Sequence, residues 1–413
     1  IFAYSVWHLR LVEGRGLTRF TERGLANLRG AIREYFDEFG HLYAAGLLTR
    51  PDVAWYLRMT GAVTESRTLS SAARVAAGKP KQKAKELRTK YRSEKIRRRR
   101  ALFYGRAQKD PIDEQLVVFA SYWFKSPAGN PLAIYEELVR RAPGARCVWL
   151  LDGRSSTMGL PAHAYVRQGW REYYDVLGRA KYFVNNVNFP NFVDKRPDTI
   201  ELQTTHGTPL KVMGIHESRA PSSTLNINGM LNRSARWDYC LSANPFSSEV
   251  WQGAYPTGFE LLESGYPRND ILHRYSERDA ADVRARLGIA PDELVVLYAP
   301  TYRQLKNRRV TPTIDFDRLA AAAGPGVRIL NRSHYFIKAR AERGASVIDV
   351  SDFPVTNELL IACDVLLTDY SSIMFDFANL RRPIINYVPD CDDYMAERAT
   401  YFDIRSKNAG LVV

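Results

Sequence analysis

The sequence lacks a long apolar run and has few cysteines. None of its segments approaches the roughly 18 to 20 consecutive apolar residues that a membrane-spanning helix needs. Its four cysteines lie far apart and form no CxxC pair, which disfavours a zinc site or a disulfide and indicates reduced, mostly buried thiols. Because the first residue is Ile1 and not Met, we expect the chain to be part of a longer protein.

Several motifs of nucleotide and hydrolytic enzymes are also missing. The chain has no GxGxxG fingerprint and no P-loop, so binding of a dinucleotide and hydrolysis of ATP have no support. No DxD pair follows a strand-like segment, and no Ser-His-Asp arrangement can be recognised from spacing. The acidic residues Asp390, Asp392 and Asp393 could hold a divalent ion, but a solvated loop explains them better, and we predict no metal site.

Positive charge is concentrated in one segment. The formal net charge is +14, and residues 79–100 hold twelve Lys or Arg against two Glu. A solvated helix face or linker is the first interpretation of such a run. A membrane surface is close behind it, because anionic lipid attracts each Lys or Arg by about 1 kcal/mol. Nucleic acid comes last, since the run has few interleaved aromatic residues and no nucleic-acid fold signature accompanies it.

Apolar periodicity divides the chain into three parts. Residues 1–112 have helical spacing, for example over residues 17–36, and end in the basic run, so we predict a helical linker or membrane-docking region. Beyond it, strand-like runs alternate with helical segments such as residues 130–142, which predicts parallel sheets covered by helices. We predict two Rossmann-like α/β domains, at 113–285 and 286–413, that face a cleft.

Polar clusters follow four of the predicted strands, where open α/β sheets bind their ligands. His206 stands at a Gly-Thr-Pro turn, and a role in proton transfer there is favoured over packing or helix capping. Thr301 and Arg303 follow a later strand. Their hydroxyl and planar guanidinium suit phosphate oxygens, although a surface arginine beside a turn explains them equally well.

The other two clusters also suit an anionic ligand. Arg332 and His334 share one face of an extended segment, and both could contact a diphosphate, although an ordinary exposed pair is the simpler explanation. Ser371 and Ser372 follow a buried strand and open a helix, whose free N–H groups can bind phosphate. Helix capping would explain one serine, so two favour a phosphate site.

Five segments in this order resemble the CDP-glycerol glycerophosphotransferases that build teichoic acids and related capsule polymers. They are HGTPLK (206–211), GYPRND (265–270), YAPTYR (298–303), the His-Tyr pair at 334–335, and the long segment 368–390 that begins TDYSSIMFDFANL. The resemblance covers roughly residues 115–400. It implies a GT-B fold, with an acceptor-side domain followed by a domain that binds the CDP-linked donor.

The resemblance also implies roles for individual residues. His206 corresponds to the proposed general base and His334 to a second essential histidine near the donor diphosphate. The remaining expected sites are donor phosphate contacts at Thr301, Arg303, Arg332, Ser371 and Ser372, ribose or base contacts at Glu358 and Asp369, acceptor-side contacts at Thr208 and Lys211, and membrane contacts at Lys95, Arg97, Arg98, Arg99 and Arg100.

The expected reaction moves glycerol phosphate, or a related polyol phosphate, from a CDP-linked donor to a hydroxyl of a cell-wall or capsule polymer and releases CMP. No cofactor is predicted to be obligatory, because the positive donors are numerous, although a divalent ion could take part. The expected partners are the CDP-polyol, a lipid-linked or polymer acceptor and an anionic membrane surface, but not nucleic acid. The expected location is peripheral, on the cytoplasmic face of the membrane. The alternatives are a GT-B sugar-nucleotide glycosyltransferase and a non-catalytic membrane-tethering subunit of a synthesis complex.

Overall fold

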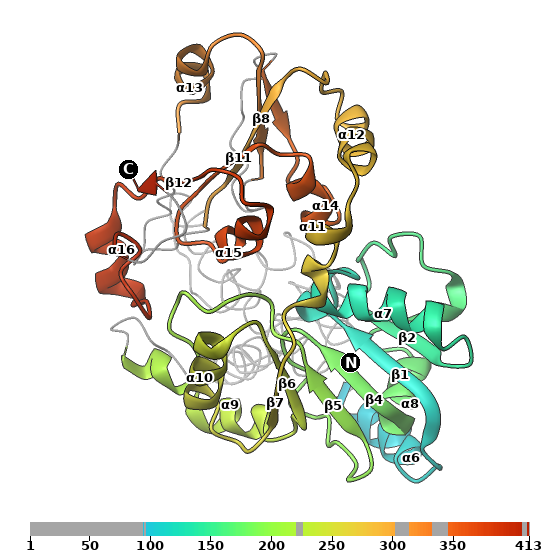
Figure 1. Cartoon of the computed structure of the whole chain (residues 1–413). Helices are drawn as coiled ribbons and strands as arrows, with labels where there is room; N and C mark the ends of the chain where they lie inside the picture. Colours follow the sequence, from blue (N-terminus) through green and yellow to red (C-terminus); the bar gives the residue numbers. More distant parts are fainter. Residues whose placement is uncertain are drawn as a thin grey trace, which may run out of the picture. The chain divides into compact units, whose positions relative to one another are not determined.

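The computed structural model describes residues 94, 96–219, 226–301, 314–332, 346–406 and 411–412 (Figure 1). The chain divides into two compact units, Ile1–Leu102 and Phe103–Val413. The predicted helix over residues 17–36 lies outside the described residues, and so do Lys95, Arg303 and His334. In the described part of the chain, no helix is both long enough and apolar enough to cross a membrane.

A seven-stranded parallel sheet forms the N-terminal lobe of the second unit, which we define as the part from β1 to β7. Its strand order is β3-β2-β1-β4-β5-β6-β7. The strands are β1 (Asp113–Ala120), β2 (Arg146–Leu151), β3 (Tyr165–Arg167), β4 (Ala180–Asn185), β5 (Ile200–Gln203), β6 (Tyr239–Ser242) and β7 (Glu260–Glu263). The helices between them include α7 (Gly129–Arg141), α8 (Arg171–Arg179), α9 (Ile227–Ser234) and α10 (Pro245–Ala254).

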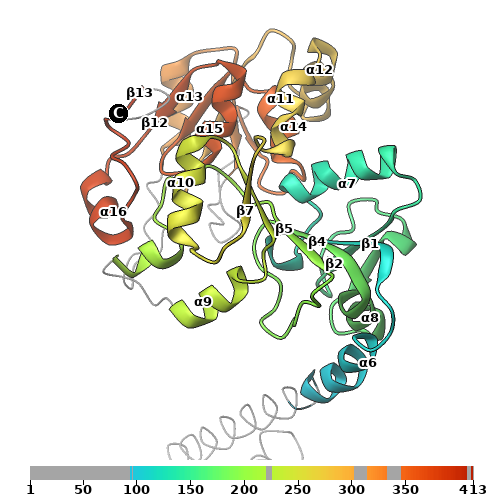
Figure 2. The same cartoon turned by 60° about the horizontal axis from the view of Figure 1, so that its bottom comes forward.

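Apolar residues line both faces of this sheet. On β1, Leu116 and Val118 pack into one cluster with α8, while Val117 and Phe119 pack into another with α7. Successive strand side chains point to opposite faces, so an unbroken apolar strand requires a helix on each side. Figure 2 shows α7 and α8 on opposite sides of the strands.

A six-stranded parallel sheet forms the C-terminal lobe, which we define as the part from α11 to β13. Its order is β10-β9-β8-β11-β12-β13. The strands are β8 (Leu294–Ala299), β9 (Val327–Asn331), β10 (Val347–Asp349), β11 (Val365–Thr368), β12 (Ile384–Asn386) and β13 (Leu411–Val412). The helices include α11 (Ile271–Arg274), α12 (Glu277–Arg286), α13 (Phe316–Ala323), α14 (Thr356–Ile361), α15 (Ile373–Phe377) and α16 (Cys391–Arg398).

One large apolar cluster holds the C-terminal lobe together. It contains Leu297 of β8 and Leu366 of β11, both fully buried, together with Leu272 of α11 and Val283 of α12. The helices α11 and α12 therefore pack in this lobe, and α12 ends at residue 286, where we predicted that the domain begins. Helix α13 lies against the other face of the sheet, where Phe316 contacts the ring of Tyr298 edge-on.

The chain after α16 returns to the N-terminal lobe. Thr400 forms an antiparallel bridge with Lys211, and the Tyr401 N–H donates to the carbonyl of Leu210 at 2.9 Å. The Tyr401 hydroxyl also lies 3.0 Å from Nδ1 of His216. This return attaches the segment after His206 to the end of the C-terminal lobe, so both lobes support that segment.

The structure confirms the predicted fold class, with two parallel α/β sheets in tandem. The predicted helix over 130–142 corresponds to α7, and the four strands predicted before the polar clusters of His206, Thr301, Arg332 and Ser371 are β5, β8, β9 and β11. Strands β3, β6, β7 and β13 were not predicted. They are two to four residues long, and β6 and β7 lie in a polar stretch between the two strand-rich regions. The limits assigned to the domains stay a prediction.

Candidate active site

A cleft of about 1270 Å³ lies between the two lobes and is lined by residues from both. The lining includes the carboxyl-end loops of the N-terminal sheet, the face of α7, and the starts of α14 and α15. Five of the predicted site residues line it: His206, Arg332, Glu358, Ser371 and Ser372. The structure thus brings together a histidine and a serine pair that are separated by more than 160 positions in the sequence.

His206 follows β5 and has a defined tautomer. Its Nδ1 lies 3.0 Å from the backbone carbonyl oxygen of Asn186. A carbonyl only accepts, so Nδ1 carries the proton and Nε2 keeps its lone pair. The side chain is exposed to solvent in the cleft, yet protein surrounds it at longer range. The surrounding protein reduces the hydration of an imidazolium, which lowers the pKa of His206 more than the hydrogen bond to the Asn186 carbonyl raises it. The cations of Arg268 and Lys211 lower this pKa further.

A left-handed turn after β1 lies beside the imidazole. Tyr122, Trp123 and Phe124 have φ values of 44°, 56° and 68°, a conformation that costs energy for residues with a side chain. The turn is held by Asn186, whose Oδ1 accepts from the Tyr122 N–H at 3.0 Å. The Tyr122 ring meets the ring of His206 edge-on, with centroids 6.4 Å apart. Asn186 therefore holds His206 through its backbone and Tyr122 through its side chain.

Gly207 lies close to the C-terminal lobe. Its φ is +152°, and a Cβ atom on it would lie 2.6 Å from Oγ of Ser372 and 3.4 Å from Nη2 of Arg268. Only glycine fits this position without displacing the serine. Leu210, further along the same segment, is part of the apolar cluster of the C-terminal lobe. The residue after the imidazole therefore lies against the serine pair.

Ser371 and Ser372 stand before α15, as predicted. Ser372 is the N-cap residue, but its side chain makes no capping hydrogen bond. Oγ of Ser371 accepts from the N–H of Ile373 at a long 3.4 Å. Both serines line the cleft. Capping therefore accounts for little of their hydrogen-bonding capacity, which leaves the hydroxyls able to contact a ligand in the cleft.

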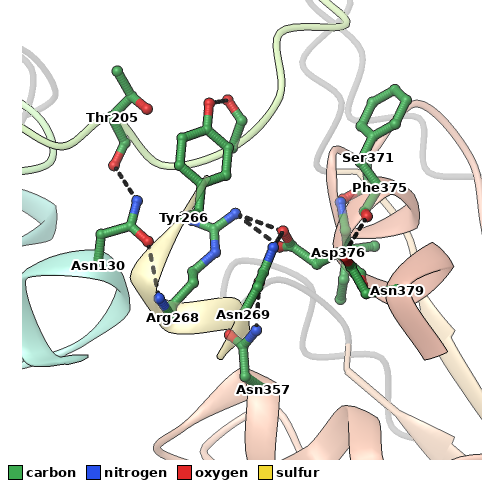
Figure 3. A network of polar contacts seen from close by, with 12 residues as sticks. Asn130, Thr205, Tyr266, Arg268, Asn269, Asn357, Ser371, Phe375, Asp376 and Asn379 are labelled. Carbon is green, nitrogen blue, oxygen red and sulfur yellow. Dashed lines mark hydrogen bonds and ion pairs between the residues drawn. The ribbon is translucent and has the colours of Figure 1, made fainter. Parts of the chain in front are cut away.

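A buried polar network joins the lobes next to the serines (Figure 3). Nη2 of Arg268 donates to both carboxylate oxygens of Asp376, at 2.7 and 3.0 Å. Asn269 donates to the same carboxylate at 2.9 Å and accepts from Asn357 at 2.9 Å. On the other side, Asn130 accepts from the Arg268 backbone N–H at 3.3 Å. The connection between the lobes is therefore tied to α7, α14 and α15.

Arg332 and Glu358 line the cleft, but each already has protein partners. Arg332 donates to the carbonyls of Val350 and Phe353 at 2.8 and 3.0 Å, and to Oγ1 of Thr356 at 3.0 Å. Its guanidinium therefore supports the loop before α14. Glu358 lies 3.4 Å from Nη1 of Arg286. Contacts of these two side chains with the donor stay predictions.

Four further predicted residues are not among those that line the cleft. Thr301 donates its backbone N–H to the Asp369 carboxylate at 2.8 Å, and both side chains are nearly inaccessible. This bond joins the ends of β8 and β11. Thr208 is also buried, and Lys211 forms the bridge to Thr400. Their roles toward donor and acceptor stay predictions.

The described part of the basic run is exposed. Arg97 and Arg98 each contact Glu94, at 2.9 and 3.0 Å, and Arg99 is exposed as well. Arg100 begins a short π-helical turn that ends at Tyr104. Surface ion pairs of this kind contribute little stability. Breaking them so that these arginines can bind another charged surface therefore costs little free energy.

Comparison with known proteins places the chain in a family. Residues 102–413 match the family of CDP-glycerol:poly(glycerophosphate) glycerophosphotransferases. The chain belongs to this family. The match covers both lobes and every residue named in the cleft, and it confirms the resemblance carried by the five sequence segments.

Individual members are similar over most of the chain. A teichoic acid poly(glycerol phosphate) polymerase of Bacillus subtilis (strain 168) is 32% identical over 79% of this chain, which spans 46% of that relative. A teichoic acid glycerol-phosphate transferase of Staphylococcus aureus (strain NCTC 8325 / PS 47) is 35% identical over 73% of this chain and 81% of the relative. A solved structure of the wall teichoic acid polymerase TagF superposes with a TM-score of 0.70, at 28% identity, over 79% of this chain and 84% of the other.

Sequence reasoning missed part of the site of this family member. Tyr122 and Asn186 received no role, although both follow predicted strands directly. Arg268 stands in the quoted GYPRND segment and Asp376 in the segment after the serines, yet neither was singled out. A signal existed for Arg268, because an arginine in a turn between two α/β domains is well placed to line their cleft.

Proposed function

We propose that this chain transfers glycerol phosphate from CDP-glycerol to a hydroxyl group of a growing wall polymer and releases CMP. One observation carries the proposal: the loop of His206 lies directly against Ser372, in a cleft between two Rossmann-like lobes. A proton acceptor and a phosphate-binding helix start are the two elements that transfer of a phosphoryl group to an alcohol requires. The similar proteins include a polymerase and a transferase of glycerol phosphate, which favours this donor.

In the proposed step, the acceptor hydroxyl attacks the β-phosphorus of CDP-glycerol. A bond forms between the acceptor oxygen and this phosphorus, and the bond from phosphorus to the bridging oxygen breaks. CMP leaves with the electron pair, and Nε2 of His206 takes the proton of the hydroxyl. The depressed pKa of His206 keeps Nε2 unprotonated near neutral pH, so it can accept that proton.

The C-terminal lobe holds the donor in this scheme. Ser371, Ser372 and the N–H groups at the start of α15 contact the phosphate oxygens, and Arg303 and His334 are proposed to assist. Glu358 is proposed to contact the ribose. Phosphoryl transfer depends mainly on positioning and on stabilising negative charge, so no covalent nucleophile is required.

The same proposal covers metal and location. No metal is proposed to be obligatory, because hydroxyl, guanidinium and N–H donors supply the stabilisation. The chain is proposed to lie on the cytoplasmic face of the membrane, where its acceptor is lipid-linked. The exposed Arg97, Arg98 and Arg99, together with Ile96 and Leu102 at 41% and 64% exposed, suit an anionic lipid surface. Activity in excess EDTA and binding to anionic against neutral vesicles test these two points.

Incubation with a panel of CDP-polyols and lipid-linked acceptors tests the reaction. We expect release of CMP and extension of the acceptor with CDP-glycerol, and loss of both in a His206→Ala variant. His163→Ala is the matched control, because His163 is an exposed histidine that does not line the cleft. Release of a nucleoside diphosphate from a nucleotide sugar would identify a glycosyltransferase instead. Equal turnover of CDP-glycerol by the His206 variant and the parent would contradict the assigned base.

A further inference from the structure

Arg268 occupies an unusual position for an arginine. It lies in η5 (Pro267–Asn269), the single turn between β7 and α11, and its side chain is 7% exposed. The guanidinium carbon lies 5.3 Å from the ring centre of Tyr266. Arginine is rarely buried without a compensating anion. Although it is so deeply placed, Arg268 lines the cleft.

The guanidinium of Arg268 lies close both to the loop of His206 and to Ser372. A Cβ atom on Gly207 would lie 3.4 Å from Nη2 of Arg268 and 2.6 Å from Oγ of Ser372. His206 is the residue before this glycine. The arginine, the serine and the loop of the imidazole therefore converge where an acceptor hydroxyl would have to meet the donor phosphate.

Only part of the hydrogen-bonding capacity of Arg268 is used by the protein. Nη2 donates to Asp376, whereas neither Nε nor Nη1 donates to a group among the described residues. One carboxylate balances the charge, but the planar fork presents five N–H groups in all. A phosphate oxygen is a ligand that this geometry fits well.

We propose that Arg268 is a further catalytic residue, which contacts the phosphoryl group as it moves from CMP to the acceptor. This inference rests on the proposed function. Because the transferring group gains negative charge on its outer oxygens, a fixed cation in a poorly solvated cleft stabilises the transition state more than the bound donor. Asp376 holds the guanidinium in place before the donor arrives.

The same cation acts on His206 in the free enzyme. The groups facing the imidazole are Tyr122 from the turn after β1, the Asn186 carbonyl after β4, Lys211 from its own segment and Arg268 from η5. Arg268 and Lys211 both disfavour an imidazolium. Removal of Arg268 should therefore raise the pKa of His206, which tests in solution whether this cation lies beside the imidazole.

Paired substitutions avoid leaving a buried charge alone. In the Arg268→Gln/Asp376→Asn double variant both charges are removed and two hydrogen-bonding amides remain. The matched control is Arg284→Gln/Asp364→Asn. That pair is also bidentate, at 2.8 Å for both bonds, but Asp364 lies at the amino end of β11, away from the cleft. Arg268→Lys keeps the positive charge and the buried ion pair but removes the planar guanidinium.

Two measurements are made on each full-length variant after its folding is checked by circular dichroism. With CDP-glycerol, we expect kcat to fall about 10²- to 10³-fold in the Arg268 double variant, to fall less in Arg268→Lys, and to stay within about threefold in the control. In an NMR titration without substrate, the pKa of His206 should rise in the Arg268 double variant and not in the control.

The outcomes separate the two hypotheses. If the parent releases CMP and the Arg268 variants turn over like the control, the catalytic role of Arg268 is wrong while the proposed function stands. If the parent does not use CDP-glycerol at all, the proposed function is wrong, and so is the catalytic role that rests on it. An unchanged His206 pKa in the double variant would contradict the placement of this cation beside the imidazole.

Discussion

The two walls of the cleft are built from the same architecture and offer different chemistry. On the N-terminal wall, β5 ends at Gln203 and His206 follows three residues later. On the C-terminal wall, β11 ends at Thr368 and Ser371 follows three residues later. Parallel strands direct the residues that follow them toward the same edge of their sheet, so an equal offset places both side chains in the cleft.

The turns that follow explain the difference. After β5, Thr205 and Gly207 have positive φ values of 52° and 152°, and the chain does not enter a helix at once, so an imidazole stands out from the loop. After β11 only four residues precede α15, so N–H groups and hydroxyls lie together at a helix start that lines the cleft. One wall is thus suited to accept a proton and the other to bind an anion. Substitutions on the first wall should change kcat, and those on the second should change KM.

The largest expected effect is on the first wall. His206→Ala should lower kcat about 10²- to 10⁴-fold, because a positioned general base contributes a factor of that size. The KM for CDP-glycerol should stay nearly constant. Initial rates of CMP release at several donor concentrations measure both. A large increase in KM with an unchanged kcat would show that His206 binds the donor instead.

The next effect is on the second wall. Ser371→Ala/Ser372→Ala should raise the KM for CDP-glycerol about 100-fold or more, since two hydrogen bonds to a charged group contribute about 1.5–3 kcal/mol each. Ser276→Ala, which removes the capping box of α12 remote from the cleft, is the control and should leave KM unchanged. A lower kcat with an unchanged KM in the double serine variant would contradict the assignment of donor binding to the second wall.

A substitution at the contact between the walls should affect stability as well. Gly207→Ala places a Cβ 2.6 Å from Oγ of Ser372 and 3.1 Å from its Cβ, at a φ of +152°. We expect the free energy of unfolding to fall by about 1–3 kcal/mol, together with a loss of activity. Adding Ser372→Gly should restore part of the stability, as measured by urea denaturation. No recovery would mean that backbone strain, and not the clash, dominates.

The smallest expected effect is a change in the pH dependence of kcat/KM. As the proposed base, His206 must be neutral to act, and its pKa is below the usual value near 6.5, so we expect kcat/KM to stay level down to about pH 6.5 and to fall at lower pH. Lys211→Met removes a cation that lowers this pKa and should move the acidic limb toward higher pH. Between pH 6.5 and the depressed pKa the unfolded chain takes up the proton first, so stability also falls as the pH decreases through that range. An acidic limb above pH 6.5 in the parent would contradict the depressed pKa.

The sequence predicted the histidine and the serines because their signals are local. An apolar run that stops at a polar residue identifies a strand end, and Ser-Ser before an apolar helical stretch identifies a helix start. Arg268 gave a weaker signal, because the importance of an arginine depends on its partner. Asp376 lies 108 positions further along the chain. Tyr122 and Asn186 were missed for the same reason, because they contribute to the site through contacts with each other and with His206.

The amino-acid sequence alone determined that two parallel sheets form in tandem, because strands that are apolar on both faces must be covered by helices on both sides. It also fixed which residues follow the strands. Tertiary structure alone decided which of these loops meet. The contact of Gly207 with Ser372, the burial of Arg268 against Asp376, and the return of the chain at Thr400 to Lys211 all join residues at least 100 positions apart. Such contacts depend on how two complete cores pack, and no local pattern in the chain encodes that packing.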